Sequence, residues 1–196
     1  MQKLILATQN THKIKELKDI LNDLDIELIS LKDLNDQDDV IEDGSSFFEN
    51  AFKKAYYFAN KYQIPALSDD SGLCVDALSG EPGIHSARYS GLGDHENNLK
   101  LLKVMENQKN RKAHFVSVIV IAYPDGHYRQ YEGKVDGLIH DQILGKNGFG
   151  YDVLFFHEPS QTTFGMLDPI IKNQISHRAN ALKLLKEDFH EIAHHE

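Results

Sequence analysis

The sequence predicts a mixed α/β fold, with residues 1–196 forming a single domain. Short apolar runs typical of strands alternate with helical patterns in the first half of the chain, and a β-rich pair of segments follows. The chain has 196 residues, of which 41% are hydrophobic, so it is long enough to bury one sizeable core. No linker, low-complexity stretch or internal repeat divides it.

The first predicted elements are a strand at Leu4-Ile5-Leu6 and a helix that follows a polar turn. The helical spacing is carried by Ile14, Leu17, Ile20, Leu21 and Leu24. Between the two elements lie Thr8, Gln9, Asn10, Thr11, His12 and Lys13. Free backbone N–H groups at a helix start attract anions, and a lysine there suits phosphate. The turn alone is weak evidence, because it lacks the pattern of a Walker A loop and a solvated Lys13 is an alternative.

A second helix is predicted from Ser46 to Tyr62. It begins with the capping-box pattern Ser46-Phe47-Phe48-Glu49. The apolar residues expected on one side of this helix are Ala51, Ala55, Phe58, Ala59 and Tyr62.

Two adjacent carboxylates follow this helix, in the segment Ser68-Asp69-Asp70-Ser71-Gly72. They come after the strand-like run Ile64–Leu67 and are therefore expected at a strand end. Adjacent side chains of an extended chain point to opposite faces, so only one of the two would enter a given cleft. Glu42-Asp43-Gly44 is another acidic turn, and carboxylate oxygens with water are the ligands that Mg²⁺ prefers. A solvated acidic turn is the alternative.

The remaining elements are a helix, a hairpin and a last helix. The helix is expected after Asp94, with Leu99, Leu102 and Met105 on its apolar side. The run Phe115–Tyr123 should return through Pro124-Asp125-Gly126 into Tyr128–Val135 as a hairpin. The last helix is marked by Ala181, Leu182, Leu185 and Phe189.

Two later segments contain residues suited to a flat, acceptor-rich ligand. Gly145–Asp152 places three glycines around Phe149, ahead of the apolar strand Val153–Phe156, so that a backbone could approach a ligand that stacks on the ring. A plain glycine turn is an equal alternative. Lys172, His177 and Arg178 gather donors at the start of the last helix, where cations are unfavourable unless an anion or acceptor arrives.

Composition narrows the functional classes. The net charge of −9 argues against nucleic acid as a partner, because a phosphate backbone requires a basic face. No apolar run is long enough for a membrane span and no signal peptide is present, which favours a cytoplasmic location. The single cysteine, Cys74, excludes an internal disulfide framework. His190, His194 and His195 have helix-like spacing for a metal, although a frayed, solvated terminus is the favoured interpretation.

Taken together, these segments resemble one family closely, the inosine triphosphate pyrophosphatases, which act on non-standard purine nucleoside triphosphates. The first part of the family pattern is matched by Thr8, Asn10, Lys13, Glu42, Gly44, Ser46, Phe47, Glu49, Asn50 and Ala51. The central part is matched by Asp69 to Leu73, Gly80, Pro82, Gly83 and Ser86 to Tyr89. The last part is matched by Gly148 to Asp152, Lys172 and Ser176 to Arg178. Nearly the whole chain is covered, in order and at the family's spacing.

The resemblance implies a long curved mixed β-sheet flanked by helices, with two lobes around a central active-site cleft, and a homodimer. It implies Mg²⁺-dependent hydrolysis of ITP, dITP or XTP to the monophosphate and pyrophosphate. Asp70 would be the general base and a Mg²⁺ ligand, and Glu42 a second ligand. The implied phosphate and sugar contacts are Thr8, Asn10, Lys13, Lys54 and Ser71, in and around the turn that also contains Gln9, Thr11 and His12. The implied base pocket consists of Phe149, Gly150, Tyr151, Asp152, Lys172, His177 and Arg178.

The implied base pocket suggests how the 6-keto purines of ITP and XTP would be separated from adenine. Lys172 and Arg178 are hydrogen-bond donors only. They would bond a keto oxygen at position 6 but would meet the adenine amino group donor to donor.

Two other functions stay open at this stage. One is a Maf-type nucleotide pyrophosphatase with another base preference, against which the Ser176-His177-Arg178 motif argues. The other is a nucleotide-binding sensor without turnover, against which the presence of both Glu42 and Asp70 argues.

Overall fold

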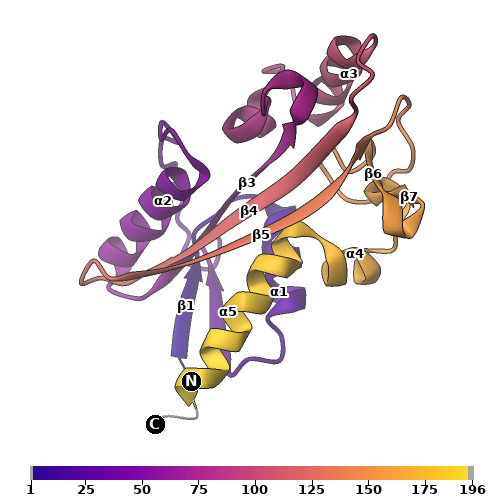
Figure 1. Cartoon of the computed structure of the whole chain (residues 1–196). Helices are drawn as coiled ribbons and strands as arrows, with labels where there is room; N and C mark the ends of the chain where they lie inside the picture. The colour runs from indigo at the N-terminus through magenta and orange to yellow at the C-terminus, as the bar shows by residue number, and fades with distance from the viewer. Residues whose placement is uncertain (1, 194–196) are drawn as a thin grey trace. The chain divides into compact units, whose positions relative to one another are not determined.

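The predicted mixed α/β architecture is confirmed by the structure, a computed structural model that describes the backbone of residues 2–193 and the side chains of residues 2–189 (Figure 1). The tail histidines His190, His194 and His195 lie outside the described side chains. No helix in the described part of the chain is long and apolar enough to cross a membrane.

Seven strands form one mixed sheet in the order β2-β1-β3-β4-β5-β6-β7. The strands are β1 (Gln2–Leu6), β2 (Ile26–Ser30), β3 (Ala66–Val75), β4 (Lys112–Ala122), β5 (Tyr128–Ile139), β6 (Phe155–His157) and β7 (Thr162–Thr163). β1 pairs in parallel with both β2 and β3, whereas β5, β6 and β7 pair in antiparallel fashion. The predicted hairpin is confirmed as β4 and β5, joined by the turn at residues 123–127.

Five α-helices accompany the sheet in the part of the chain that the structure describes. They are α1 (Thr11–Ile20), α2 (Phe47–Tyr62), α3 (Asp94–Met105), α4 (Pro169–Ile175) and α5 (His177–Ala193). The predicted start of α2 is confirmed, because the Ser46 hydroxyl accepts a hydrogen bond from the Glu49 N–H at 3.1 Å. The reciprocal bond differs from a capping box: the Glu49 carboxylate accepts from the backbone N–H of Ser45 at 2.7 Å.

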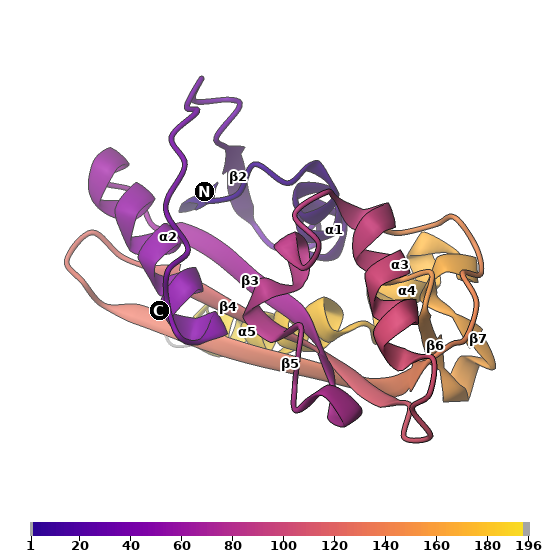
Figure 2. The ribbon, with the colours of Figure 1, turned by 90° about the horizontal axis from the view of Figure 1, so that it is seen from above.

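By its contacts the chain divides into two compact units, and β3, β4 and β5 each supply residues to both. The first unit comprises Met1–Asp70, Ser117–Gly133 and Arg178–Glu196. Its core joins α1 and α5 to the strands through residues such as Leu17, Leu67 and Leu182. Figure 2 shows α2 on one side of the strands of this unit and α5 on the other.

The second unit comprises Ser71–Val116 and Lys134–His177. An aromatic cluster lies at its centre, where the Phe115 ring is 4.5 Å from that of Phe155 and 4.7 Å from that of His177, centroid to centroid. Leu101 and Met105 of α3 are fully buried in the same core.

Three sequence expectations need correction. Asp69 and Asp70 do not follow the end of a strand but lie inside the ten-residue β3, whose backbone pairing continues past them. The strand expected at Val153–Phe156 is instead Phe155–His157. The apolar side of α3 is set by Leu101 and Met105 at helical spacing, so that Leu99 remains 42% exposed.

We expect Ser68→Ala to raise the free energy of unfolding by about 1 kcal/mol, measured by urea denaturation. The Ser68 hydroxyl is fully buried in β3 without a hydrogen-bond partner among the described residues, and such a group carries a desolvation penalty of about 1–3 kcal/mol.

The matched control is Ser117→Ala in β4. The Ser117 hydroxyl is equally buried but donates to the Asp69 carboxylate at 2.5 Å, so its removal should lower the free energy of unfolding by about 1–3 kcal/mol. A loss of stability in Ser68→Ala as large as that in Ser117→Ala would contradict the expectation.

Candidate active site

The buried carboxylate of Asp69 is the centre of an ionic cluster in the first unit. Its oxygens accept hydrogen bonds from Ser117, and from Arg178 through Nε at 3.1 Å and Nη2 at 2.7 Å. The Lys13 ammonium lies 3.0 Å from the same carboxylate. Burial alone would raise the pKa of Asp69, but Arg178 and Lys13 hold it far below its ordinary value. Asp69 is therefore ionised and fully engaged by structural partners.

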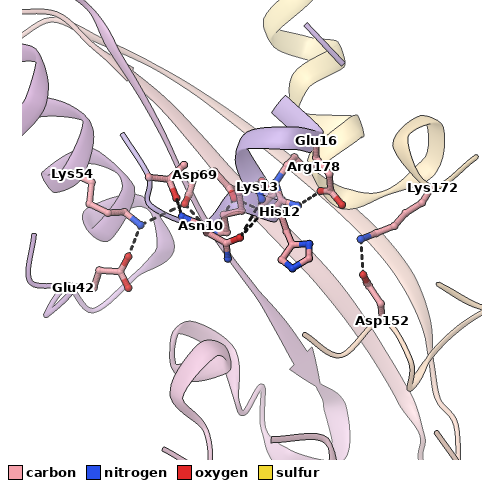
Figure 3. A network of polar contacts seen from close by, with 12 residues as sticks. Asn10, His12, Lys13, Glu16, Glu42, Lys54, Asp69, Asp152, Lys172 and Arg178 are labelled. Atoms are coloured by element: carbon pink, nitrogen blue, oxygen red, sulfur yellow. Dashed lines mark hydrogen bonds and ion pairs between the residues drawn. The ribbon is translucent and has the colours of Figure 1, made fainter. Parts of the chain in front are cut away.

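Arg178 belongs to this ionic cluster and is itself fully buried (Figure 3). Its guanidinium donates to Asp69 and, through Nη1, to the Glu16 carboxylate at 2.5 Å. Burial alone would lower the pKa of Arg178, but the two carboxylates raise it above its ordinary value. The sequence placed Arg178 among the base contacts. In the structure its guanidinium contacts the carboxylates of Asp69 and Glu16, and all three residues lie in the first unit.

Asp70, the next residue of β3, has a different environment, as the alternation of side chains along a strand predicts. It is 6% exposed, and Asn50 is the one described residue that donates a hydrogen bond to its carboxylate, at 3.1 Å. Burial raises the pKa of Asp70, although the nearby charges of Lys54 and Lys13 oppose the shift. A buried carboxylate with few partners and a raised pKa is suited to accept a proton from a reacting group.

Asn50 was matched to the family pattern but was given no role from the sequence. Its side chain donates to Asp70 and accepts a hydrogen bond from the backbone N–H of Gly44 at 2.8 Å. A single amide of α2 therefore holds the acidic turn around Glu42 and the Asp70 carboxylate in one arrangement. Its burial, at 1% exposed, is the signal of this role, and burial is visible only in the fold.

Two lysines complete the cluster. Lys54 forms an ion pair with Glu42, and its ammonium is 3.5 Å from the backbone carbonyl of Asp69. The Lys13 ammonium donates to the same carbonyl at 3.1 Å. Burial lowers the pKa of Lys13, and the neighbouring Asp69 opposes this shift. Two cations therefore meet at the peptide group that precedes Asp70, where an anionic ligand would be stabilised.

Glu42 and Asp70 are the carboxylates that the family resemblance implies for a metal ion. Glu42 is close enough to Asp70 to raise the pKa of its carboxyl group further. In the described part of the chain no three or more His, Cys, Asp or Glu side chains are placed to hold a metal together. Mg²⁺ is commonly held by one or two carboxylates together with substrate phosphates and water, so this pair fits Mg²⁺ that arrives with a phosphorylated ligand.

The polar turn before α1 is shaped by its own side chains. Asn10 caps the helix by accepting hydrogen bonds from the N–H groups of His12 at 2.9 Å and Lys13 at 3.2 Å. Thr8 accepts from the Asn10 N–H, and Gln9 donates to the carbonyl of Asp36 at 3.0 Å. Two of the backbone N–H groups that were expected to bind an anion are therefore already bonded, which leaves Lys13 as the charged group of the turn.

A second polar cluster lies within the second unit and consists of Phe149, Asp152 and Lys172. The Asp152 carboxylate accepts hydrogen bonds from the Lys172 ammonium at 2.5 Å and from the Phe149 N–H at 2.9 Å. The same ammonium is 4.9 Å from the centroid of the Phe149 ring (Figure 3 shows the Lys172–Asp152 pair). Lys172 and Asp152 are both buried, so the pair combines a donor, an acceptor and an aromatic face in one place.

The other residues of the implied base pocket are placed differently. The Tyr151 hydroxyl donates to the carbonyl of Ser86 at 2.8 Å inside the core of the second unit. His177 is buried and stacks on Phe115. Ser71 is half-buried in β3, at the first position of the second unit. Of the residues that the resemblance implied for the base pocket, the structure brings together Phe149, Asp152 and Lys172, whereas the side chains of Tyr151 and His177 lie in the core of the second unit.

Comparison with known proteins gives one consistent result. Residues 4–188 match the model of the Ham1 family. The chain is 46% identical over 191 residues to the dITP/XTP pyrophosphatase of Desulfotalea psychrophila, covering 96% of this chain and 86% of that protein.

Two solved structures are similar to this fold. A HAM1 protein from Coxiella burnetii has a TM-score of 0.90 and 38% identity, covering 97% of this chain and 100% of that one. The Ham1 protein of Staphylococcus aureus has a TM-score of 0.88 and 40% identity, with 97% and 99% covered.

We expect Arg178→Ala to lower the free energy of unfolding by about 3–5 kcal/mol in urea denaturation, because it leaves the buried Asp69 carboxylate without its principal cation. The control is Lys53→Ala, which removes the exposed ion pair with Asp43 and should change stability little. Wild-type stability in Arg178→Ala would show that this guanidinium is not a structural ion.

Proposed function

The chain belongs to the Ham1 family, and from this premise we propose that it hydrolyses non-standard purine nucleoside triphosphates (ITP, dITP and XTP) to the monophosphate and pyrophosphate. The observation that carries the proposal is the contrast between two adjacent carboxylates of β3. The Asp69 carboxylate is held by Lys13 and Arg178. The Asp70 carboxylate is buried near two lysines and accepts a hydrogen bond from Asn50, and burial raises its pKa. The relatives named dITP/XTP pyrophosphatases support this assignment.

The proposed hydrolysis breaks the anhydride bond between the α- and β-phosphates. Asp70 is the group that orients the attacking water and accepts its proton, because burial brings its pKa closer to the operating pH. Lys13 and Lys54 stabilise the negative charge on the phosphoryl oxygens. Asn50 keeps the Asp70 carboxylate in place through its hydrogen bond.

We assign Mg²⁺ to Glu42 and Asp70, together with phosphate oxygens of the substrate. When bound, the ion would supply charge stabilisation for the transferred phosphoryl group. The Lys54 ammonium forms an ion pair with Glu42. When the substrate is bound, we assign this ammonium to a phosphate oxygen.

The purine is assigned to Phe149, Asp152 and Lys172. Hypoxanthine and xanthine present a keto oxygen at position 6 and an N–H at position 1, whereas adenine presents an amino group and an unprotonated nitrogen there. The Lys172 ammonium is a donor and the Asp152 carboxylate an acceptor, which complements the first pattern and opposes the second. The Phe149 ring provides a stacking face. From the sequence, recognition of position 6 was assigned to Lys172 and Arg178. Here Lys172 is assigned to the keto oxygen and Asp152 to the neighbouring N–H at position 1, and Arg178 is left out.

The two alternatives from the sequence are less well supported. A binding sensor without turnover needs no buried carboxylate with a raised pKa, and a Maf-type preference agrees less with relatives named dITP/XTP pyrophosphatases. The homodimer and the cytoplasmic location remain predictions from the family resemblance.

The test of the proposed function is pyrophosphate release from a panel of ITP, dITP, XTP, ATP, GTP and dUTP, with and without Mg²⁺. We expect rapid, Mg²⁺-dependent release from the first three nucleotides. Asp70→Asn should reduce this rate by roughly 10²–10⁴, the range typical of a lost general base. Tight ITP binding without any release of pyrophosphate would support the sensor instead.

Stability measurements on the same variants separate a lost base from a lost fold. The pKa of Asp70 is raised in the folded state, so its ionised form is disfavoured by folding above its ordinary pKa, and Asp70→Asn should keep or increase stability at pH 7. The pKa of Asp69 is lowered, so its contribution is present at pH 7 and is lost as the pH falls. Asp69→Asn should therefore be destabilising at pH 7. An inactive but unfolded Asp70→Asn variant would not support the assignment.

For the base, we expect Lys172→Ala to lower kcat/KM for ITP and XTP about 10- to 100-fold more than for ATP, because a hydrogen bond to a charged donor contributes about 1.5–3 kcal/mol. Lys54→Ala, the control at the phosphate cluster, should reduce activity on all three nucleotides by similar factors. Equal losses on ITP and ATP in Lys172→Ala would place this lysine outside base recognition.

A further inference from the structure

Two side chains at the start of α3 form hydrogen bonds with the backbone N–H and C=O groups of Gly150. The Asp94 carboxylate accepts a hydrogen bond from the Gly150 N–H at 2.7 Å. The Asn98 amide nitrogen donates to the Gly150 carbonyl at 2.8 Å. Figure 2 shows α3 beside the segment that leads into β6, and both lie within the second unit. Two side chains one helical turn apart therefore grip a single residue more than 50 positions away in the sequence.

Asn98 makes this contact at a cost. Its side chain is 3% exposed, and its amide nitrogen also donates to the carbonyl of Asp94 at 2.8 Å. Two carbonyl acceptors fix which end of the amide faces Gly150. The amide oxygen is then buried without a hydrogen-bond partner among the described residues. An unpaired buried acceptor is unfavourable, so the hydrogen bond from Asn98 to Gly150 has to offset that penalty.

Hydrogen bonds from α3 hold both backbone groups of Gly150. The residue has φ +59°, a conformation that favours glycine, and a Cβ built there would meet no atom within 4 Å. Gly148, two residues earlier, is crowded, because a Cβ there would lie 2.0 Å from the Asp152 carboxylate. The space beside the Gly150 Cα is open, and Asp94 and Asn98 bond both of its backbone groups.

Gly150 lies between the residues to which the purine is assigned. It follows Phe149, whose N–H donates to Asp152, and Asp152 in turn accepts from Lys172. A shift of Gly150 would move the Phe149 ring and the Asp152 acceptor relative to the Lys172 donor. Misplacement of a recognition group by about 1 Å is enough to weaken its contact with a ligand strongly.

We propose that Asp94 and Asn98 are positioning residues for base recognition, which fix Phe149 and Asp152 through the Gly150 backbone. This inference rests on the proposed function for its choice of ligand, a 6-oxopurine nucleotide. The hydrogen bonds of both residues to Gly150 lie within the second unit, whereas the carboxylate cluster belongs to the first, so their loss should weaken selection of the base and leave phosphate binding unchanged.

The test compares Asp94→Ala and Asn98→Ala with the wild type. We expect the ratio of kcat/KM for ITP to that for ATP to fall about 3- to 10-fold in each variant, as for one lost hydrogen bond. The affinity for pyrophosphate with Mg²⁺, measured by calorimetry, should not change. Asp94→Asn should restore the ratio, because an amide oxygen also accepts from the Gly150 N–H. Asn98→Asp should not, because a carboxylate would face the Gly150 carbonyl.

The matched control is Glu96→Ala, which removes the other acidic side chain from the first turn of α3, while the hydrogen bonds of Asp94 and Asn98 to Gly150 stay in place. An unchanged nucleotide ratio, or a parallel fall in pyrophosphate affinity, would overturn the inference. Amide hydrogen exchange of residues 148–152 provides a readout that needs no activity. Faster exchange in Asp94→Ala and Asn98→Ala, but not in Glu96→Ala, is expected even if the wild type hydrolyses no triphosphate. That result would separate a failure of the proposed function from a failure of the positioning role, which unchanged exchange would exclude.

Discussion

The buried charge of Asp69 is the constraint on which the first unit depends. An isolated carboxylate in a core would be strongly unfavourable, and here it is stabilised by Lys13 of α1, Arg178 at the start of α5 and the Ser117 hydroxyl of β4. Three elements distant in sequence are thereby fixed around one residue of β3. The same interaction fixes the ammonium of Lys13 at the peptide group before Asp70, so a structural charge also arranges the cations proposed to meet phosphate.

Asp69 and Asp70 are adjacent and identical residues, but the geometry of β3 places their side chains in opposite environments. Asp69 faces the cations and its pKa falls, whereas Asp70 faces Asn50 and its pKa rises with burial. Neither property follows from the residue type, since both are aspartates. The opposite faces of β3 provide one carboxylate for structure and one for the proposed proton transfer, and the continuity of the strand past both residues keeps the two environments apart.

Local patterns predicted those features that depend on neighbours in sequence. The Ser46 cap, the β4–β5 hairpin and the opposite directions of Asp69 and Asp70 were all available in this way. The extension of β3 through the acidic pair was not predicted, because aspartate is depleted in strands and its presence favours a turn. The partner of Arg178 lies 109 residues away at Asp69, and local spacing carries no information about such a contact. Asn98 was missed for the same reason, since an asparagine within a helix has no local sign of a partner at Gly150.

The two clusters belong to different compact units, and two of the points where the chain passes between the units fall at residues of the first cluster. Asp70 is followed by Ser71, the first residue of the second unit, and His177, which stacks in the second core, is followed by Arg178 of the first. The proposed proton acceptor and the proposed base contacts are therefore supported by separate cores. If the purine binds as proposed, substitutions around Phe149, Asp152 and Lys172 should change which purine is accepted without disturbing the ions that surround Asp69. Under the proposed function, discrimination among nucleotides and hydrolysis of the anhydride are then separable properties of one chain, and each cluster contains its own buried ion pair.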